Sequence, residues 1–425
     1  MVVLIAIFIS AALLPINRIY GIHADVGPNN HQTRAKRGVL ITEKYWKEGL
    51  PYRFEGLGDF MKNEFKKAVR TWEENTCVNF TEIAHSPPNK ASVLVKWHVS
   101  RCASVIGKTG YPDQRIYLAP ACEYGIIAHE LGHALGLVHT HERPDRDKYV
   151  KVFVDVDPDT NFDFRNYTKE EVETYNLGYD YGSIMQYSMT DYYGSWDDPA
   201  MMPLDGRYNY TLGSEIVSFN DFTMINNRYG CRQKCLKQRR VVKCDNGGYE
   251  HPRNCSKCLC PSGFGGDSCN ERPNENNCGG ILNATQKYQK HTFEFANDRW
   301  DWLDGFKKCY WWIKAPNGTA IDIRVSTIED YPYSPQGCRA AGIEIKANDD
   351  QTLTGYRICH KSQIGLVFES KHNLVPIITF TKMSDTSRYT IKYRHGEFFL
   401  YNKRLFGLKI DRQIKQTLVT ICAVK

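Results

Sequence analysis

The sequence predicts a multidomain protein with a mixed α+β domain over residues 38–231, a small disulfide-rich module over 232–270, a β-sandwich over 278–395 and a basic tail over 396–425. In the first segment, apolar residues recur with both helical and strand periods. Six cysteines crowd the second segment, which is too short to build a core of its own. Short alternating strands return in the third segment, as in small sandwiches.

The first residues of the chain predict a leader that precedes the folded domains. Residues 1–14 are almost entirely apolar, which is too short for a membrane-spanning helix but typical of the apolar core of a signal peptide. We therefore expect a signal peptide over residues 1–20, in preference to a buried strand, and a propeptide over residues 21–37. The propeptide would end at Arg37, in a dibasic R-A-K-R stretch that suits basic-specific convertases. No later stretch is apolar enough to span a membrane, so we expect a secreted protein.

The composition agrees with an extracellular globular protein. The net charge of +7 is modest for 425 residues, and the scattered Lys and Arg favour a solvated surface over nucleic-acid binding. An oxidising compartment would pair most of the 15 cysteines and leave at least one over. The candidate N-glycosylation sequons begin at Asn79, Asn166, Asn209, Asn254, Asn283 and Asn317.

Several segments have a clear periodicity. In Phe60–Glu73 apolar residues recur every three or four positions, which predicts an amphipathic helix. Ala91–Val99 alternates like a strand, and Gly125–Leu137 is predicted to be helical. In the third segment Ala320–Val325 and Tyr389–Tyr393 alternate as strands do.

The strongest functional signal is the eleven-residue stretch H-E-L-G-H-A-L-G-L-V-H. His129 and His133 lie one helical turn apart and can share one zinc ion. Glu130 follows the first ligand and can act as general base toward a zinc-activated water. Gly136 can take a left-handed conformation that ends the helix, so that His139 turns back and completes three ligands. Three protein ligands leave one position open, as a catalytic zinc site requires, whereas a core helix that merely carried these residues would bury them at high cost.

A second signal, S-I-M-Q-Y, follows the zinc stretch. Its Met185 alone would indicate core packing, but together with the extended zinc motif it resembles the Met-turn of metzincins. On these residues the chain resembles the astacin metallopeptidases, and looks most like the nematode members with trailing EGF-like and CUB modules. The resemblance covers roughly residues 38–395. Its anchors are Leu50–Tyr52, His129–His139, Arg143–Asp147, Ser183–Tyr187 and Arg228–Cys231.

The family resemblance has implications for the zinc site. It implies an α+β metzincin fold in which the zinc helix divides an upper from a lower subdomain, with the substrate cleft between them. It implies that Tyr187 is a further zinc ligand that can also donate a hydrogen bond to the oxyanion. The sequence departs from the family at Thr140, because many members have a glutamate there that meets the mature amino terminus.

The cysteine-rich module resembles an EGF-like domain through C-D-N-G-G and C-P-S-G-F-G-G, and the third segment resembles a CUB domain through C-G-G and C-Y-W. A zinc-ribbon alternative for the module is disfavoured by the oxidising compartment. Cys422 has no implied partner, and a free thiol and an intermolecular bridge both stay open, as does the oligomeric state. The disulfides that the resemblance implies are Cys77–Cys231, Cys102–Cys122, Cys235–Cys255, Cys244–Cys258, Cys260–Cys269, Cys278–Cys309 and Cys338–Cys359.

The expected function is that of a secreted endopeptidase that hydrolyses peptide bonds in extracellular proteins with one zinc ion per chain. The resemblance adds a zymogen that is released by cleavage after Arg37, with Asp25 as the candidate carboxylate that blocks the zinc before release. The EGF-like and CUB modules imply contacts with partner proteins or matrix. Two alternatives are a non-catalytic adhesion protein that keeps the same fold and a secreted zinc hydrolase with a non-protein substrate.

Overall fold

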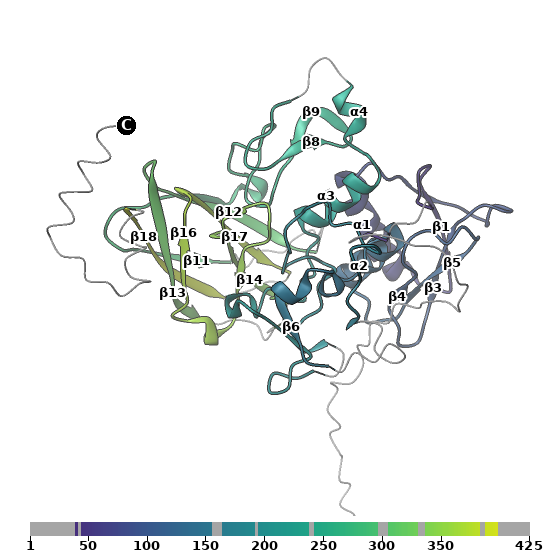
Figure 1. Ribbon diagram of the computed structural model, residues 1–425, viewed down its shortest axis with the longest axis horizontal. Helices are drawn as coiled ribbons and strands as arrows, with labels where there is room; N and C mark the ends of the chain where they lie inside the picture. The colour runs from purple at the N-terminus through teal and green to yellow at the C-terminus, as the bar shows by residue number, and fades with distance from the viewer. Residues whose placement is uncertain are drawn as a thin grey trace, which may run out of the picture.

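The computed structural model describes residues 39–40, 44–154, 164–191, 194–237, 242–295, 305–329, 336–382 and 387–397 (Figure 1). The predicted signal peptide and propeptide, with Asp25 and Arg37, lie outside these residues, as does Cys422. Within the described ranges, no helix has both the length and the apolar character needed to cross a bilayer. Figure 1 shows a domain of sheet and helices, a small module at one side of it, and a β-sandwich.

The first domain begins with a five-stranded sheet in the order β2-β1-β3-β5-β4. β1 pairs in parallel with β2 and β3, and β3 pairs in parallel with β5, whereas the edge strand β4 runs antiparallel to β5. The predicted strand Ala91–Val99 is confirmed as β3, which is two residues shorter at each end. The strands are β1 (Leu50–Glu55), β2 (Phe80–Glu82), β3 (Val93–Trp97), β4 (Ala103–Ser104) and β5 (Gln114–Leu118).

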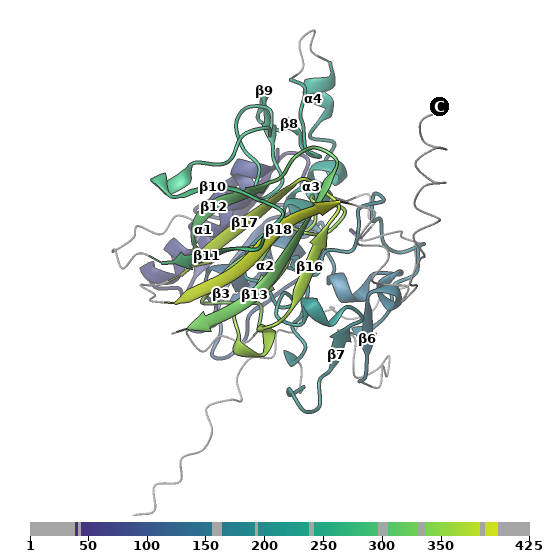
Figure 2. The same ribbon diagram turned by 90° about the vertical axis from the view of Figure 1, so that its left-hand side faces the viewer.

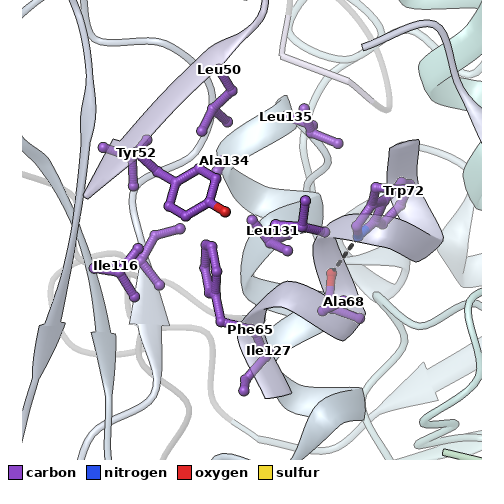
Figure 3. Close-up of a cluster of buried hydrophobic side chains, with 14 of the residues drawn as sticks. Leu50, Tyr52, Phe65, Ala68, Trp72, Ile116, Ile127, Leu131, Ala134 and Leu135 are labelled. Carbon is purple, nitrogen blue, oxygen red and sulfur yellow. Dashed lines mark hydrogen bonds between the residues drawn. The ribbon is translucent and has the colours of Figure 1, made fainter. Parts of the chain in front are cut away.

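Two helices pack on this sheet and enclose the first core. They are α1 (Asp59–Asn75) and α2 (Tyr124–Leu135). The predicted helix at Phe60–Glu73 is confirmed as α1, which buries the apolar face that its periodicity defines. Trp72 Nε1 donates a hydrogen bond to Ala128 O of α2 at 3.0 Å, which fixes the two helices together. Side chains of both helices meet those of β1 and β5 in this core (Figure 3): Leu50, Tyr52, Phe65, Ile116 and Leu131.

The rest of the first domain is mostly irregular. It contains an antiparallel pair, β6 (Val150–Val152) with β7 (Met201–Pro203), and the helix α3 (Phe219–Arg228). Ser218 caps α3, because its side chain accepts a hydrogen bond from Asp221 N at 3.1 Å. Among the described residues the 3-10 turns are η1 (Thr140–Glu142), η2 (Arg146–Lys148), η5 (Gly206–Tyr208), η6 (Glu275–Asn277) and η7 (Lys361–Gln363).

The small module has one antiparallel hairpin, β8 (Tyr249–His251) with β9 (Asn254–Leu259), after the short helix α4 (Gln233–Leu236). Three disulfides cross it, so covalent links replace the core that so few residues cannot build. The described residues contain seven disulfides, in the same pairs that the family resemblance implies: Cys77–Cys231, Cys102–Cys122, Cys235–Cys255, Cys244–Cys258, Cys260–Cys269, Cys278–Cys309 and Cys338–Cys359.

The third part is a sandwich of two sheets, with strand orders β10-β12-β17-β14-β15 and β11-β18-β13-β16 (Figure 2). Only β10 and β12 pair in parallel among the described strands of these sheets. The predicted strands Ala320–Val325 and Tyr389–Tyr393 fall inside β13 and β18. The strands are β10 (Gly279–Asn283), β11 (Gln289–Glu294), β12 (Lys307–Lys314), β13 (Thr319–Glu329), β14 (Ala341–Ile345), β15 (Tyr356–Ile358), β16 (Val367–Ser370), β17 (Leu374–Thr381) and β18 (Arg388–Glu397).

The sandwich packs directly against the first domain, an arrangement that the sequence did not predict. Thr354 N of the sandwich donates to Asp180 Oδ1 of the first domain at 3.2 Å. The rings of Tyr208 and Tyr356 lie 4.3 Å apart across the same boundary, and both side chains are buried. The two domains therefore share a buried interface with both polar and aromatic contacts.

Candidate metal centre

The helix α2 carries the first two histidines and ends where the chain must turn back. Gly136 follows Leu135 with φ 111°, a left-handed conformation that glycine adopts without strain. The predicted helix end at Gly136 is confirmed, although the predicted span to Leu137 was two residues too long. The turn returns His139 to the helix, and the ligand atoms of His129, His133 and His139 all lie within 4.8 Å of one another.

Backbone oxygens hold the first two rings. His129 Nδ1 lies 2.8 Å from Ile184 O, and His133 Nδ1 lies 2.8 Å from Leu137 O. A proton on each Nδ1 can donate to that oxygen, which leaves the lone pair of Nε2 directed at the centre.

A carboxylate holds the third ring. His139 Nδ1 lies 3.1 Å from Glu142 Oε2, and His139 N donates to the same oxygen at 3.2 Å. Glu142 is only 3% exposed, and burial raises its pKa to about 8 against the opposing charges of Arg165 and Arg146. Glu142 was not predicted as a functional residue. The H-x-x-E spacing after the third histidine is the sequence signal that points to it.

The three histidines fit a zinc ion. His129 Nε2 has no hydrogen-bond partner among the described residues, and the Nε2 atoms of His133 and His139 face each other at 3.2 Å. Burial and then the neighbouring histidines lower the pKa of His129 to about 3, and they lower that of His133 well below 6.5. Both rings are therefore neutral near pH 7. Three converging imidazoles are a donor set that zinc prefers, with a fourth position left for chemistry.

The other two predicted site residues are both buried: Tyr187 contacts the rings of the centre, and Glu130 adjoins the first ligand in sequence. Glu130 follows His129 on α2 and is fully buried, with 0% exposure. The ring centroid of Tyr187 lies 4.4 Å from that of His139 and 6.5 Å from that of His129. The structure thus brings together a phenol and three imidazoles from two segments of the chain, with the buried Glu130 next to the first imidazole in sequence.

The chain matches known proteins over most of its length. The family model Astacin (Peptidase family M12A) matches residues 39–230. Zinc metalloproteinase nas-31 of Caenorhabditis elegans is 37% identical over 333 residues, which cover 78% of this chain and 52% of that protein. Zinc metalloproteinase nas-25 of the same species is 30% identical over 385 residues, which cover 88% of this chain and 94% of that one. The chain belongs to the astacin family.

Some of these astacins are much longer proteins. The chain spans 52% of the length of nas-31 and 42% of the length of nas-30. Among solved structures, the chain is similar to High choriolytic enzyme 1 from Oryzias latipes (Medaka fish), a hatching enzyme zinc-protease. The two are 25% identical with a TM-score of 0.38, and the match covers 45% of this chain and 96% of that one.

In this astacin the loop that carries Met185 packs against the zinc-site helix. A Cβ added at Gly132 would lie 2.8 Å from Met185 Sδ, so the Met185 side chain packs tightly on α2 and would have to shift for any larger residue there. Asp221 holds the loop, because its Oδ2 accepts from Ile184 N at 2.9 Å and its Oδ1 accepts from Ser183 Oγ at 2.6 Å. Asp221 was not predicted either. The S-x-x-D capping box before α3 predicts a helix start there, but not the link to this loop.

Thr140, at the start of η1, is hydrogen-bonded to the Met185 loop. Thr140 N donates to Met185 O at 2.9 Å, and Thr140 Oγ1 donates to Ser183 Oγ at 2.9 Å. Thr140 lines a small cavity of about 30 Å³ together with Asp180 and Asp221. Burial raises the pKa of both aspartates, that of Asp221 to about 6.

The sequons of this astacin differ in exposure. Asn209 is half-buried, and the other five asparagines are exposed: Asn79, Asn166, Asn254, Asn283 and Asn317.

Proposed function

We propose that this astacin is a secreted, zinc-dependent endopeptidase that hydrolyses peptide bonds in extracellular proteins. The observation that supports it is the convergence of three buried imidazole nitrogens next to the carboxylate of Glu130. His129, His133 and His139 would hold one zinc ion. When bound, zinc supplies a Lewis acid that polarises a peptide carbonyl and lowers the pKa of water.

Two side chains would move protons and stabilise charge. Glu130 takes a proton from the attacking water and returns it to the leaving amine, as a carboxylate beside the first ligand can do. Its complete burial keeps bulk water away from this transfer. Tyr187 donates its phenolic hydrogen to the developing oxyanion, and it is also the proposed fourth protein ligand of the zinc. The contact of its ring with that of His139, at 4.4 Å between centroids, supports this assignment.

Cleavage of a denatured protein tests this function. We expect the mature protein to cut casein or gelatin, a chelator to abolish cleavage, and added zinc to restore it. A His129→Ala variant should lose both zinc and activity. If the protein binds zinc but cuts no denatured protein, it is an adhesion protein that keeps the fold. If it hydrolyses only non-protein esters or amides, it is a zinc hydrolase of another class.

The two trailing parts are proposed to be an EGF-like module over residues 232–270 and a CUB domain over residues 278–395. Three disulfides around one hairpin support the first assignment, and a two-sheet sandwich with two disulfides supports the second. Both would bind partner proteins or matrix rather than take part in catalysis. Cys422, which lies outside the described residues, stays either a free thiol or an intermolecular bridge.

Secretion and latency are further parts of this proposal. A signal peptide over residues 1–20 would direct export, and cleavage after Arg37 would activate the enzyme by removing a leader in which Asp25 blocks the zinc. Three forms of the protein test this: leader intact, starting at Gly38, and starting two residues earlier. We expect activity only in the two shorter forms. Full activity with the leader intact would refute latency, and an Asp25→Asn variant that stays latent would refute the role of Asp25.

A further inference from the structure

A cavity lies where the first domain, the small module and the sandwich meet. Its volume is about 360 Å³, which is within the range of small-molecule sites. α1 contributes Asn75, the start of α3 contributes Ser218 and Phe219, β9 contributes Leu259, and the sandwich contributes Lys346. Among the described residues that line this junction cavity, none is a histidine of the metal centre. A ligand in it would therefore be separate from the zinc.

Strand alternation explains why Lys346 lies at this cavity. In β14, Ile343 and Ile345 belong to the sandwich core, so Glu344 and Lys346, which follow the opposite parity, face the first domain. Such an outward face would ordinarily be solvated. Here the first domain covers it, and Lys346 is left only 1% exposed.

The ammonium group of Lys346 has no hydrogen bond or ion pair within the part of the chain that the structure describes. The carboxylate of Glu344 is already engaged, since its Oε1 accepts from Gly355 N at 2.9 Å and its Oε2 lies 3.4 Å from Arg357 Nε. Burial lowers the pKa of Lys346, while Glu344 and Asp180 oppose that shift. A buried ammonium without a hydrogen-bond partner is costly, so Lys346 is a candidate partner for a bound anion. The lining also holds the carboxylates of Glu74, Glu275 and Glu344 and the cations of Lys308 and Arg357.

Other groups at the cavity favour an anion. The ten-residue helix α3 begins at its wall, and the N-terminal end of a helix carries a partial positive charge. In this first turn Asp221 N is already taken by Ser218 Oγ, so only the remaining amides are available to a ligand. Arg357 also lines the cavity and donates from Nη1 to Ser214 Oγ at 2.7 Å. The lining carboxylate of Glu275 accepts from Tyr310 OH at 3.3 Å, so it is engaged as well.

We propose that the junction cavity binds a small organic anion, with Lys346 as the partner of its carboxylate or phosphate group. The anion would give Lys346 a direct hydrogen-bonded partner and would lie near the start of α3. The cavity has room for roughly ten water-sized groups, which suits a metabolite-sized molecule rather than a bare halide. Because three parts of the chain form the walls, the bound anion would hold them together.

Titration of the full-length, zinc-loaded protein tests this site. Succinate and inorganic phosphate are the two probes, and sodium chloride at matched ionic strength is the control for screening. Binding is followed by calorimetry and by the rise of the unfolding midpoint with probe concentration. Lys346→Met removes the charge, and Lys361→Met, on an exposed lysine of the same sandwich, is the matched control.

We expect saturable binding of at least one probe to the wild type and to Lys361→Met, and at least tenfold weaker binding to Lys346→Met. Binding of succinate alone would identify a carboxylate ligand, and binding of phosphate alone a phosphate ligand. Lys346→Gln keeps a polar group and takes over the test if Lys346→Met does not fold. Absence of saturable binding of both probes would overturn the assignment. Equal affinity in wild type and Lys346→Met would overturn it too.

Discussion

The metal centre and the junction cavity each contain a buried nitrogen without a hydrogen-bond partner among the described residues, yet they are built differently. At the metal centre, His129 Nε2 faces two further imidazoles that come from the same eleven-residue stretch. At the cavity, Lys346 Nζ faces groups that three separate parts of the chain supply. One helix and one glycine turn set the first geometry, whereas domain packing sets the second.

This difference shows what kind of interaction fixes each site. The centre is rigid because each ring is held through Nδ1 by an oxygen nearby, so its chemistry should survive small changes at the domain boundary. The cavity exists only while the sandwich covers the first domain. Changes at the metal centre should therefore alter catalysis or zinc affinity, and changes at the boundary should alter stability instead.

The largest expected effect is that of Glu130→Gln. The amide cannot accept a proton, so we expect kcat/KM to fall by about 10²–10⁴-fold while one zinc ion per chain is retained. Parallel measurement of metal content and peptide cleavage checks this, with the exposed Glu170→Gln as the matched control. Activity near that of the control would show that another group is the base.

Tyr187→Phe should have the next largest effect. It removes one oxygen from a buried ring beside His139, so the fold and the three-histidine site should remain. Loss of one oxyanion donor should lower kcat by about a hundredfold with little change in KM. Steady-state kinetics separates the two parameters. A raised KM with unchanged kcat would assign the tyrosine to substrate binding.

Glu142→Gln tests whether the hydrogen bond between Glu142 and His139 helps the metal centre to bind zinc. At pH 9, above the pKa of about 8 of Glu142, the wild-type bond is charge-assisted, whereas the amide oxygen of the variant can still accept from His139 Nδ1 but without the charge. We expect zinc affinity to fall by about 10–100-fold, as is typical when the carboxylate behind a metal-bound histidine is altered. Competition with a chromophoric chelator measures this affinity, again beside Glu170→Gln. Unchanged affinity would mean that the contact with Glu142 is not needed to hold the ring of His139.

The same contrast explains how far the sequence could predict this protein. α1 was predicted from the period of its apolar residues, and the zinc motif from the spacing of its ligands and the glycine at the helix end. All of these are local properties of the chain. Asp221 and Lys346 were not predicted as functional residues. Asp221 acts on the Met185 loop from a distant helix, and Lys346 looks like an ordinary outward residue of an alternating strand until another domain covers it.

The smallest expected effect lies at the domain boundary, in the ion pair of Lys382 with Glu123 and Glu215. Lys382 Nζ lies 3.0 Å from Glu123 Oε2 and also contacts Glu215, and its side chain is only 19% exposed. Lys382→Met should lower the free energy of unfolding by about 1–2 kcal/mol, because the buried Glu215 loses one of its cationic partners. Lys371→Met is the comparison, because it breaks the ion pair of Lys371 with Asp349 on the sandwich, whose side chains are 61% and 65% exposed. This change should alter the free energy of unfolding by less than about 0.5 kcal/mol.

For Lys382→Met, the decisive measurement is the zinc affinity of the variant, determined together with its free energy of unfolding and compared with the wild type. Sites that share no contacts usually act independently, so the affinity should match that of wild type even though the domain boundary is weakened. A tenfold loss of zinc affinity would contradict this independence. It would mean that the sandwich helps to hold the metal centre, through the Thr354 to Asp180 hydrogen bond and the loop that leads from Asp180 to Met185. In that case a ligand in the junction cavity could act on catalysis as well as on stability.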